Sequence, residues 1–293
     1  MPPTNKIILG TVQFGLEYGI NNHSGKPTPA TVNTILDVAF ENSINILDTA
    51  EVYGNAQEVI GNYHLSSKNK FDVITKFSSS RNDLSENLKN RIRQNLNTLN
   101  IDSLYCYMFH SFNDFKKYFD FYKNEIAALK EEGLIKKFGV SVYTNHEIEE
   151  LLGFEGIDVI QLPFNLLDNT QQRSSTIKKA KEKGVEIHTR SAFLQGLFFK
   201  NTNELPKKLI PLLPYLNEIN SISKNNNIDL NSLSLNYAIQ QNTIDHVLIG
   251  VDTVDQLIAN ISLLQKSISR EVCQQIDSII VKETDLLNPS NWN

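Results

Sequence analysis

The sequence predicts an α/β protein that folds as a closed (β/α)8 TIM barrel with extra helices near the C-terminus, and three observations support this fold class. Short apolar runs alternate with stretches in which apolar residues recur at helical spacing. The alternation occurs eight times, and eight parallel strands joined by right-handed crossovers close into a barrel. The first strand-to-turn junction, from Gly10 to Gly15, lacks the Gly-x-Gly-x-x-Gly pattern of an open dinucleotide-binding sheet.

The eight strand–helix units follow one another along the chain. They are expected at strand 6–10 with helix 31–42, strand 44–48 with helix 55–64, strand 71–76 with helix 84–99, strand 103–109 with helix 114–132, strand 137–141 with helix 145–152, strand 157–162 with helix 169–183, strand 185–189 with a longer helical region, and strand 246–249 with helix 253–265. Insertions are expected at 11–29 and 192–206, and extra helices around 206–241 and at 269–282. No linker interrupts this pattern, which predicts one domain over residues 1–293.

Composition favours small-molecule chemistry in the cytoplasm. The 293 residues are 40% hydrophobic and 21% charged, and the formal charge of −5 comes without a basic block, which argues against nucleic acid or an anionic membrane as a partner. No apolar stretch approaches the roughly 20 residues that span a bilayer, and residues 1–6 lack the layout of a secretory signal. The two cysteines, Cys106 and Cys273, are expected to be free thiols. The sequence does not indicate an oligomeric state.

The stretch from Ile46 to Gly54 organises the predicted functional site. It is an apolar run closed by Asp48, with Tyr53 in the loop beyond. The next apolar run ends at Lys76, and a further one is followed by His110. Because the carboxyl ends of parallel strands meet at one rim of a barrel, we expect these four side chains to lie together. A tyrosine with its ordinary pKa of about 10 donates a proton poorly at neutral pH, and a nearby cation favours its ionised form.

Each of these residues also has an ordinary structural interpretation. Asp48 would cap the following loop, Lys76 would be a solvated strand end, and His110 would be a hydrogen-bonded rim histidine. Their occurrence together, with Tyr53, indicates chemistry. The remaining histidines show no metal-ligand spacing, so we expect packing or surface roles and no metal, with only one of them near the mouth, His188 on the seventh strand. These remaining histidines are His23, His64, His146, His188 and His246.

With these residues in order, the sequence resembles the aldo-keto reductases over nearly its whole length. The resemblance is carried by segments at the predicted strand ends. They are Leu47-Asp48-Thr49-Ala50-x-x-Tyr53-Gly54-Asn55 with Gly61, Thr75-Lys76, Phe109-His110, Gly139-Val140-Ser141, Ile160-Gln161, and Ile249-Gly250 with Gln256 and Asn260. The resemblance implies a barrel that binds an extended nicotinamide dinucleotide and reduces the carbonyl group of a small molecule.

The resemblance also implies a role for each of the four residues. Tyr53 would be the general acid that protonates the carbonyl oxygen as hydride arrives from the nicotinamide. Lys76 would lower the pKa of Tyr53, Asp48 would hold Lys76 charged and oriented, and His110 would donate a hydrogen bond that aims the carbonyl. Positioned proton transfer of this kind contributes about 10²–10⁴-fold to a rate.

The cofactor contacts implied by the resemblance extend around the barrel mouth. Ser141 and Gln161 stand where the family binds the nicotinamide carboxamide, but Val142 replaces the asparagine that commonly follows the serine. Arg190 replaces an aromatic ring, so we expect it either to stack on or hydrogen-bond with the nicotinamide, or to turn outward into a salt bridge. The full predicted cofactor set is Gly10, Thr11, Asp48, Ser141, Gln161, Arg190, Ser191, Leu194, Gly196, Gly250, Asp252, Gln256 and Asn260, with 191–197 as the loop over the pyrophosphate.

The resemblance leaves NADP and NAD open as cofactors. The family holds the 2′-phosphate of NADP with Lys, Ser or Arg near the start of the last barrel helix, where this chain has Asp252 and, at the usual arginine position, Gln256. Asp252 is also expected to be the helix N-cap. A carboxylate repels a phosphate, so our hypothesis is a weakened NADP preference.

The sequence leaves two other functions open, and it does not fix the identity of the substrate. A nucleotide-sensing regulatory subunit with a reductase-like barrel is the first alternative, and a large exposed apolar patch would favour it. A barrel lyase or isomerase is the second, but the phosphate or metal ligands it would need are not found. Segments 12–20, 140–143 and 190–196 look like bacterial reductases associated with surface-polysaccharide sugar synthesis, which suggests a sugar or nucleotide-sugar carbonyl. Five aromatic residues are expected either to line the substrate pocket or to belong to the core, namely Phe14, Tyr18, Tyr143, Phe193 and Phe198.

Overall fold

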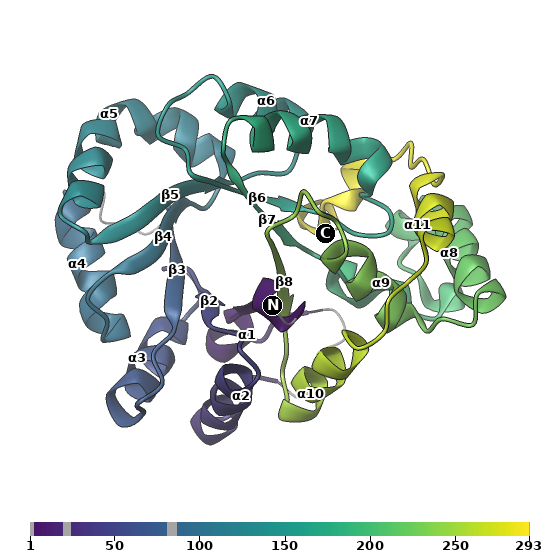
Figure 1. Cartoon of the computed structure of the whole chain (residues 1–293), viewed down its shortest axis with the longest axis horizontal. Coiled ribbons are helices and arrows are strands. Elements are labelled where there is room, and N and C mark those ends of the chain that lie inside the picture. Colours follow the sequence, from purple (N-terminus) through teal and green to yellow (C-terminus); the bar gives the residue numbers. More distant parts are fainter. Residues whose placement is uncertain (1–2, 20–24, 81–86, 293) are drawn as a thin grey trace.

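The chain folds into a closed barrel of eight parallel strands. The structure is a computed structural model, and it describes residues 3–19, 25–80 and 87–292. The strands are β1 (Ile7–Gly10), β2 (Ile46–Asp48), β3 (Asp72–Phe77), β4 (Leu104–Phe109), β5 (Ile135–Ser141), β6 (Val159–Pro163), β7 (Glu186–Arg190) and β8 (His246–Gly250). Each strand pairs with its neighbour in chain order, and β1 pairs with β8 to close the ring. Figure 1 shows the strands with the helices arranged around them. The predicted barrel is therefore confirmed.

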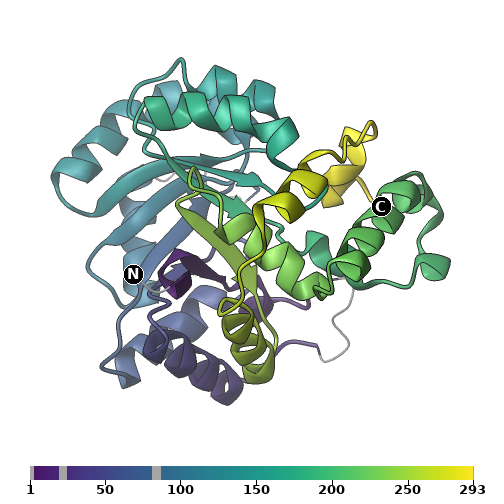
Figure 2. The same ribbon diagram turned by 45° about the vertical axis from the view of Figure 1, so that its right-hand side comes forward.

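Helices surround the strands and extend the fold on one side. They are α1 (Val12–Gly15), α2 (Pro29–Glu41), α3 (Ala56–Ser66), α4 (Leu88–Leu99), α5 (Phe112–Glu131), α6 (Asn145–Leu151), α7 (Thr170–Glu182), α8 (Leu213–Asn225), α9 (Leu230–Ile239), α10 (Val254–Leu263) and α11 (Arg270–Asp277). The extra helices α8 and α11 lie against each other outside the ring (Figures 1 and 2). Side-chain caps define many helix starts, including Thr28 before α2 and Ser111 before α5.

The observed bounds differ from the expected ones at a few ends. β5 begins at Ile135, two residues before the predicted strand 137–141, because Ile135 is buried and pairs with Leu104 of β4. The loop predicted after β1 contains the four-residue helix α1. The last predicted helix, 269–282, ends at Asp277, and the buried residues Ile279 and Val281 follow without helical structure. The first residues of the predicted helix 84–99 lie outside the described residues.

The barrel interior is packed with apolar side chains beneath a polar mouth. Ile8, Ile74, Cys106, Met108 and Val159 form this inner core, which is separate from the larger core between strands and helices. Strand residues nearer the carboxyl ends, such as Asp48, Lys76 and Gln161, are polar although fully buried. The fold therefore places chemistry at the carboxyl ends of the strands, as is usual for a barrel of this type. Cys106 and Cys273 are free, as expected, and no helix of the described residues is long and apolar enough to cross a membrane.

Candidate active site

The four side chains predicted to meet do lie together at the barrel mouth. Lys76, at the end of β3, is only 1% exposed and forms an ion pair with Asp48 at the end of β2. Its ammonium also donates to the carbonyl oxygen of Thr49 at 3.1 Å and lies 5.4 Å from the ring centre of Tyr53. The ring of His110 meets the ring of Tyr53 edge to face, with 5.7 Å between their centres. The expected convergence is therefore present.

A buried carboxylate anchors the loop that carries Tyr53. The side chain of Glu51 is fully buried and pairs with Arg91 of α4, whose Nε donates to it at 2.8 Å. Asn95 of α4 and the Tyr107 hydroxyl of β4 donate to its other oxygen at 2.8 and 2.9 Å. Our reading of the sequence missed this network. The available signal was Arg91 and Asn95, one helical turn apart on the buried face of α4.

Two glycines let the backbone of this loop touch helix α1. A Cβ atom on Gly15 would come within 1.8 Å of the carbonyl oxygen of Tyr53. Gly54 has a φ of 55°, a left-handed conformation that favours glycine, and a Cβ there would come within 2.4 Å of the Gly15 oxygen. The chain therefore passes directly against itself beside the phenol.

Burial dominates the electrostatics of the site. It raises the pKa of Tyr53 well above its ordinary value, with the charge of Asp48 acting in the same direction. The expected lowering of this pKa by Lys76 is therefore not seen, because the Lys76 charge is balanced by Asp48. Burial lowers the pKa of Lys76, against the effect of Asp48, and burial with the positive charge of Lys76 lowers the pKa of His110 to about 3. At neutral pH the mouth thus holds a protonated phenol and a neutral imidazole, which are both hydrogen-bond donors.

A cavity of about 460 Å³ opens over these residues. Ten of the predicted cofactor residues line it, namely Gly10, Asp48, Ser141, Gln161, Arg190, Ser191, Gly196, Gly250, Asp252 and Gln256. Tyr53 and His110 also line it, whereas Lys76 lies beneath them. The lining therefore runs from the catalytic candidates to the start of α10.

Three predicted cofactor residues do not line the cavity. The Thr11 hydroxyl is buried and donates to the carbonyl oxygen of Asp48 at 3.0 Å, so it supports the end of β2. Leu194 is fully buried in the core, and Asn260 lies further along α10, beyond the lining. The positions of these residues in the sequence could not distinguish side chains that face the cavity from side chains that pack behind its lining.

Arg190 faces the cavity and stacks on Tyr143. Its guanidinium carbon is 4.1 Å from the Tyr143 ring centre, and one of its nitrogens donates to the carbonyl oxygen of Val142 at 3.2 Å. Among the described residues it has no carboxylate partner, so the expected alternative of an outward salt bridge is wrong. Arg190 therefore brings a positive charge close to Tyr53 and His110.

The start of α10 is capped differently from our expectation. Thr253, and not Asp252, is the N-cap, and its hydroxyl accepts from the backbone N–H of Gln256 at 3.2 Å. The Gln256 side chain in turn accepts from the backbone N–H of Asp252 at 2.7 Å. This reciprocal pair resembles a capping box, and it leaves Asp252 at the cavity wall.

Of the five aromatic residues expected in the pocket or the core, three line the cavity and two lie in the core. Tyr18, Tyr143 and Phe193 line the cavity, whereas Phe14 and Phe198 are buried in the core. Phe199 and Gln13 line it without having been predicted. No sequence signal distinguished Phe199 from Phe198, but Gln13 follows the strand end at Gly10 by only three residues.

The residues present fit a nicotinamide dinucleotide. The Oε1 atom of Gln13 is buried in the wall without a hydrogen-bond partner among the described residues. A Cβ atom on Gly250 would come within 2.5 Å of the Gln13 amide, so the glycine leaves room for this side chain to lie against the end of β8. Ser141 supplies a further polar group, and Gln161, whose amide donates to Asp48 at 2.8 Å, links the cavity floor to the ion pair.

One histidine does not lie where we expected it. His188 is fully buried, does not line the cavity, and contacts Glu186 at the amino end of β7, so its predicted position near the mouth is wrong. His246 at the start of β8 is its cross-strand neighbour. The two residues are 58 positions apart in the sequence, which is why spacing gave no indication of their contact.

Comparisons with known proteins agree with the barrel fold and identify its family. Residues 6–281 match the family model described as the aldo/keto reductase family. The "Uncharacterized oxidoreductase YqkF" of Bacillus subtilis (strain 168) is 24% identical over 248 residues, covering 78% of this chain and 80% of that protein. The "NADH-specific methylglyoxal reductase" of Escherichia coli (strain K12) is 20% identical, covering 81% and 83%. Among solved structures, the aldo-keto reductase AKR11C1 from Bacillus halodurans (holo form) has a TM-score of 0.75 at 19% identity, covering 95% and 94%.

Proposed function

The chain belongs to the aldo/keto reductase family of oxidoreductases, and on that premise we propose that it reduces a polar aldehyde or ketone with hydride from NADH or NADPH, with Tyr53 as the proton donor. The observation that carries the proposal is the Tyr53 hydroxyl, which lines the cavity and has no hydrogen-bond partner among the described residues. The phenol is therefore open to a substrate oxygen.

The side chains around this hydroxyl have distinct tasks in the proposed reaction. Bound NAD(P)H supplies the hydride. Tyr53 gives its proton to the developing alkoxide, which is more basic than a phenolate, so a raised Tyr53 pKa does not prevent the transfer. His110 is neutral, since its pKa is about 3, and its N–H orients the carbonyl oxygen. Lys76 is held by Asp48 behind the phenol and adds a positive charge where negative charge develops.

Replacement of Tyr53 by phenylalanine tests the proton donor. We expect kcat for an aldehyde to fall by about 10²–10⁴-fold, while the dissociation constant for NAD(P)H stays within about twofold, because the phenol acts on the substrate. Tyr105→Phe is the matched control, since Tyr105 lies outside the cavity and should leave kcat nearly unchanged. If the Tyr53→Phe variant kept its turnover, the proton delivered to the substrate oxygen would come from another group.

The cofactor preference is proposed to lean away from NADPH. Asp252 lines the cavity at the start of α10, and the Gln256 side chain is already engaged with the Asp252 backbone. No lysine or arginine lines this end of the cavity among the described residues. In a fluorescence titration we expect NADH to bind at least as tightly as NADPH, and Asp252→Asn to tighten NADPH alone. NADPH binding ten times tighter than NADH in the native chain would contradict this assignment.

The substrate is proposed to be a polar sugar or nucleotide-sugar carbonyl. This rests on the resemblance of segments 12–20, 140–143 and 190–196 and on the hydrogen-bonding groups of Tyr18, Arg190 and Gln195 at the cavity. A panel of aldehydes is the test, with hydroxylated sugars expected to have a higher kcat/KM than apolar aldehydes of similar size. A preference for methylglyoxal, the substrate named for one relative, or for apolar aldehydes would remove the sugar assignment but keep the reductase.

A further inference from the structure

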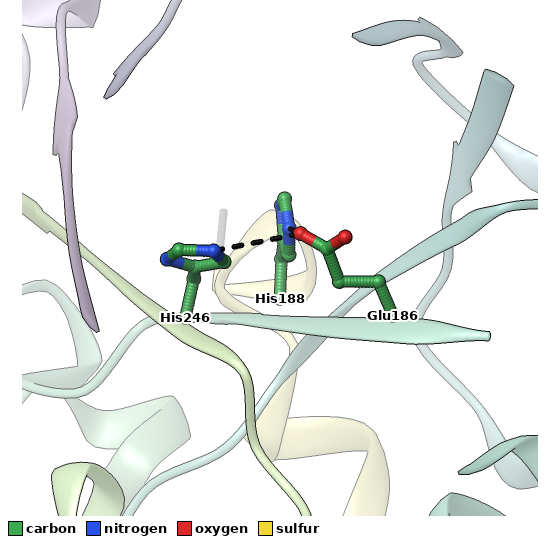
Figure 3. A group of neighbouring side chains, drawn as sticks. All are labelled: Glu186, His188 and His246. Carbon is green, nitrogen blue, oxygen red and sulfur yellow. Dashed lines mark hydrogen bonds and ion pairs between the residues drawn. The ribbon is translucent and has the colours of Figure 1, made fainter. Parts of the chain in front are cut away.

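A second cluster of titratable side chains lies at the amino end of β7 and β8, away from the cavity. Figure 3 shows Glu186, His188 and His246 turned toward one another. Oε1 of Glu186 is 2.7 Å from Nε2 of His188 and 3.5 Å from Nε2 of His246. The ligand atoms that the three residues offer all lie within 4.8 Å of one another. None of them lines the cavity, so the proposed reaction does not use them.

The donor set is one that transition metals bind. Two imidazole nitrogens and one carboxylate oxygen are a known zinc-binding combination, with a fourth position for water. Zinc–ligand bonds of about 2.0–2.2 Å put tetrahedral ligand atoms roughly 3.3–3.5 Å apart. The His246–Glu186 separation already meets this value, and the His188–Glu186 separation must open by roughly 0.6 Å. This small adjustment replaces the hydrogen bond between His188 and Glu186 by a coordination bond from each of these residues to the ion.

The free nitrogens of the two rings allow the required protonation state. Nδ1 of His188 and Nδ1 of His246 are both buried and have no hydrogen-bond partner among the described residues. In the metal-free chain the Glu186 carboxylate, 2.7 Å from Nε2 of His188, accepts that ring's Nε2–H; when an ion binds, the proton moves to the unpartnered Nδ1 and the Nε2 lone pair faces the ion. The side chain of His188 is fully buried, whereas that of His246 is 17% exposed, which provides a route for an ion from solvent.

The carboxylate is held in place by two further side chains. The Tyr105 hydroxyl donates to Oε1 at 2.7 Å, and Lys137 forms an ion pair with Oε2. Such outer contacts orient a metal ligand, but the charge of Lys137 opposes a cation. Lys137 is 31% exposed and can move toward solvent when an ion binds.

We propose that Glu186, His188 and His246 form a binding site for a divalent transition metal ion of the Zn²⁺ class, which ties β7 to β8. These two strands share only the pairs His188–His246 and Thr189–Val247, the shortest pairing in the barrel. An ion held by both strands reinforces this junction. Because it binds only the folded chain, it stabilises the fold in proportion to the logarithm of the free ion concentration.

The test is a titration of the full-length chain, without a histidine tag and after treatment with a chelator, with Zn²⁺ and with Co²⁺. We expect one equivalent of Zn²⁺ by calorimetry, a rise in Tm with Zn²⁺, and visible Co²⁺ absorption bands of a low-coordinate site. Glu186→Gln and His246→Gln should each weaken binding by at least about 10–100-fold, since loss of a direct ligand costs no less than loss of an outer contact. Lys137→Met should tighten it by roughly threefold or more, since a repelling charge is removed.

The control is His146→Gln, because His146 is exposed on α6 and belongs to no such cluster. It should bind Zn²⁺ like the native chain. The proposal is overturned if the native chain and Lys137→Met bind no Zn²⁺ saturably, or if Glu186→Gln and His246→Gln bind as tightly as the native chain. Circular dichroism of each variant verifies that weaker binding does not come from unfolding. None of these measurements uses turnover, so the outcome is separate from that of the proposed function.

Discussion

The two ends of the barrel hold the same kinds of side chain in different arrangements. At the carboxyl ends of the strands, a carboxylate, an ammonium, a phenol and an imidazole meet as Asp48, Lys76, Tyr53 and His110. At the amino ends, the Glu186 cluster repeats these types, with Lys137, Tyr105 and His188 as the partners. The difference lies in where the hydrogen bonds go.

At the amino end, the phenol and one imidazole both bond to the carboxylate. Tyr105 and His188 each contact Glu186 at 2.7 Å, so their protons are already committed to a protein group. At the mouth, the carboxylate is taken by Lys76 and Gln161, and the phenol of Tyr53 is left facing the cavity. The comparison teaches that the same residue types leave a hydroxyl available to a ligand only where the carboxylate bonds to other groups and the phenol faces a cavity.

The largest predicted difference between the two ends is the effect of removing the ammonium. Lys76→Met leaves Asp48 charged and fully buried without its cation, and should cost about 3–5 kcal/mol in the free energy of unfolding. Lys137→Met removes a partly exposed ion pair and should cost about 0–1 kcal/mol in the metal-free chain. Urea unfolding of both variants measures the difference, and equal losses would mean that burial does not separate the two pairs.

A smaller loss of stability is expected when the contact between Glu51 and Arg91, which holds the Tyr53 loop, is removed. Among the described residues, the cluster at the amino end has no such loop to hold. Tyr53 lies on a loop held by Glu51, whereas Tyr105 lies within β4. Arg91→Gln should remove about 2 kcal/mol from the free energy of unfolding, because Glu51 loses its buried cation but keeps Asn95 and Tyr107. It should also lower kcat more than it raises KM, since the phenol is displaced. A normal kcat with reduced stability would make Glu51 a purely structural anchor.

The smallest effect is a pH dependence at the mouth. His110 has no carboxylate partner among the described residues, unlike His188, and its pKa in the folded chain is about 3 against an ordinary value of 6.5. Between about pH 6.5 and 3 the unfolded chain binds this proton and the folded chain does not, so the stability falls as the pH falls through this window. His110→Gln should flatten that slope, measured as unfolding free energies at pH 7 and pH 5. An unchanged slope would show that His110 is protonated in the fold.

The strand ends were the part of the site that the sequence could predict. Asp48, Lys76 and His110 each close or follow an apolar run, and parallel strands bring such ends to one rim. Contacts made between distant segments were not predictable in this way. Glu51 meets Arg91 across 40 positions, and His188 meets His246 across 58. The spacing of Arg91 and Asn95 on α4 indicates a buried polar face, but no local pattern identifies Glu51 as its partner or His246 as the partner of His188. The direction in which the Tyr53 pKa shifts depends on how deeply the phenol is buried and on how the charges of Asp48 and Lys76 offset each other, and neither can be read from the sequence.

The contact between Gly15 and the Tyr53 carbonyl has a mechanical consequence. Val12 and Gln13, on the same short helix α1, line the cavity wall, and the helix rests on the Tyr53 backbone with no side chain between them. A ligand that displaced this helix would therefore also shift the backbone of Tyr53, the proposed proton donor. We expect a ligand beside Val12 and Gln13 to influence the position of the phenol while the barrel strands stay in place.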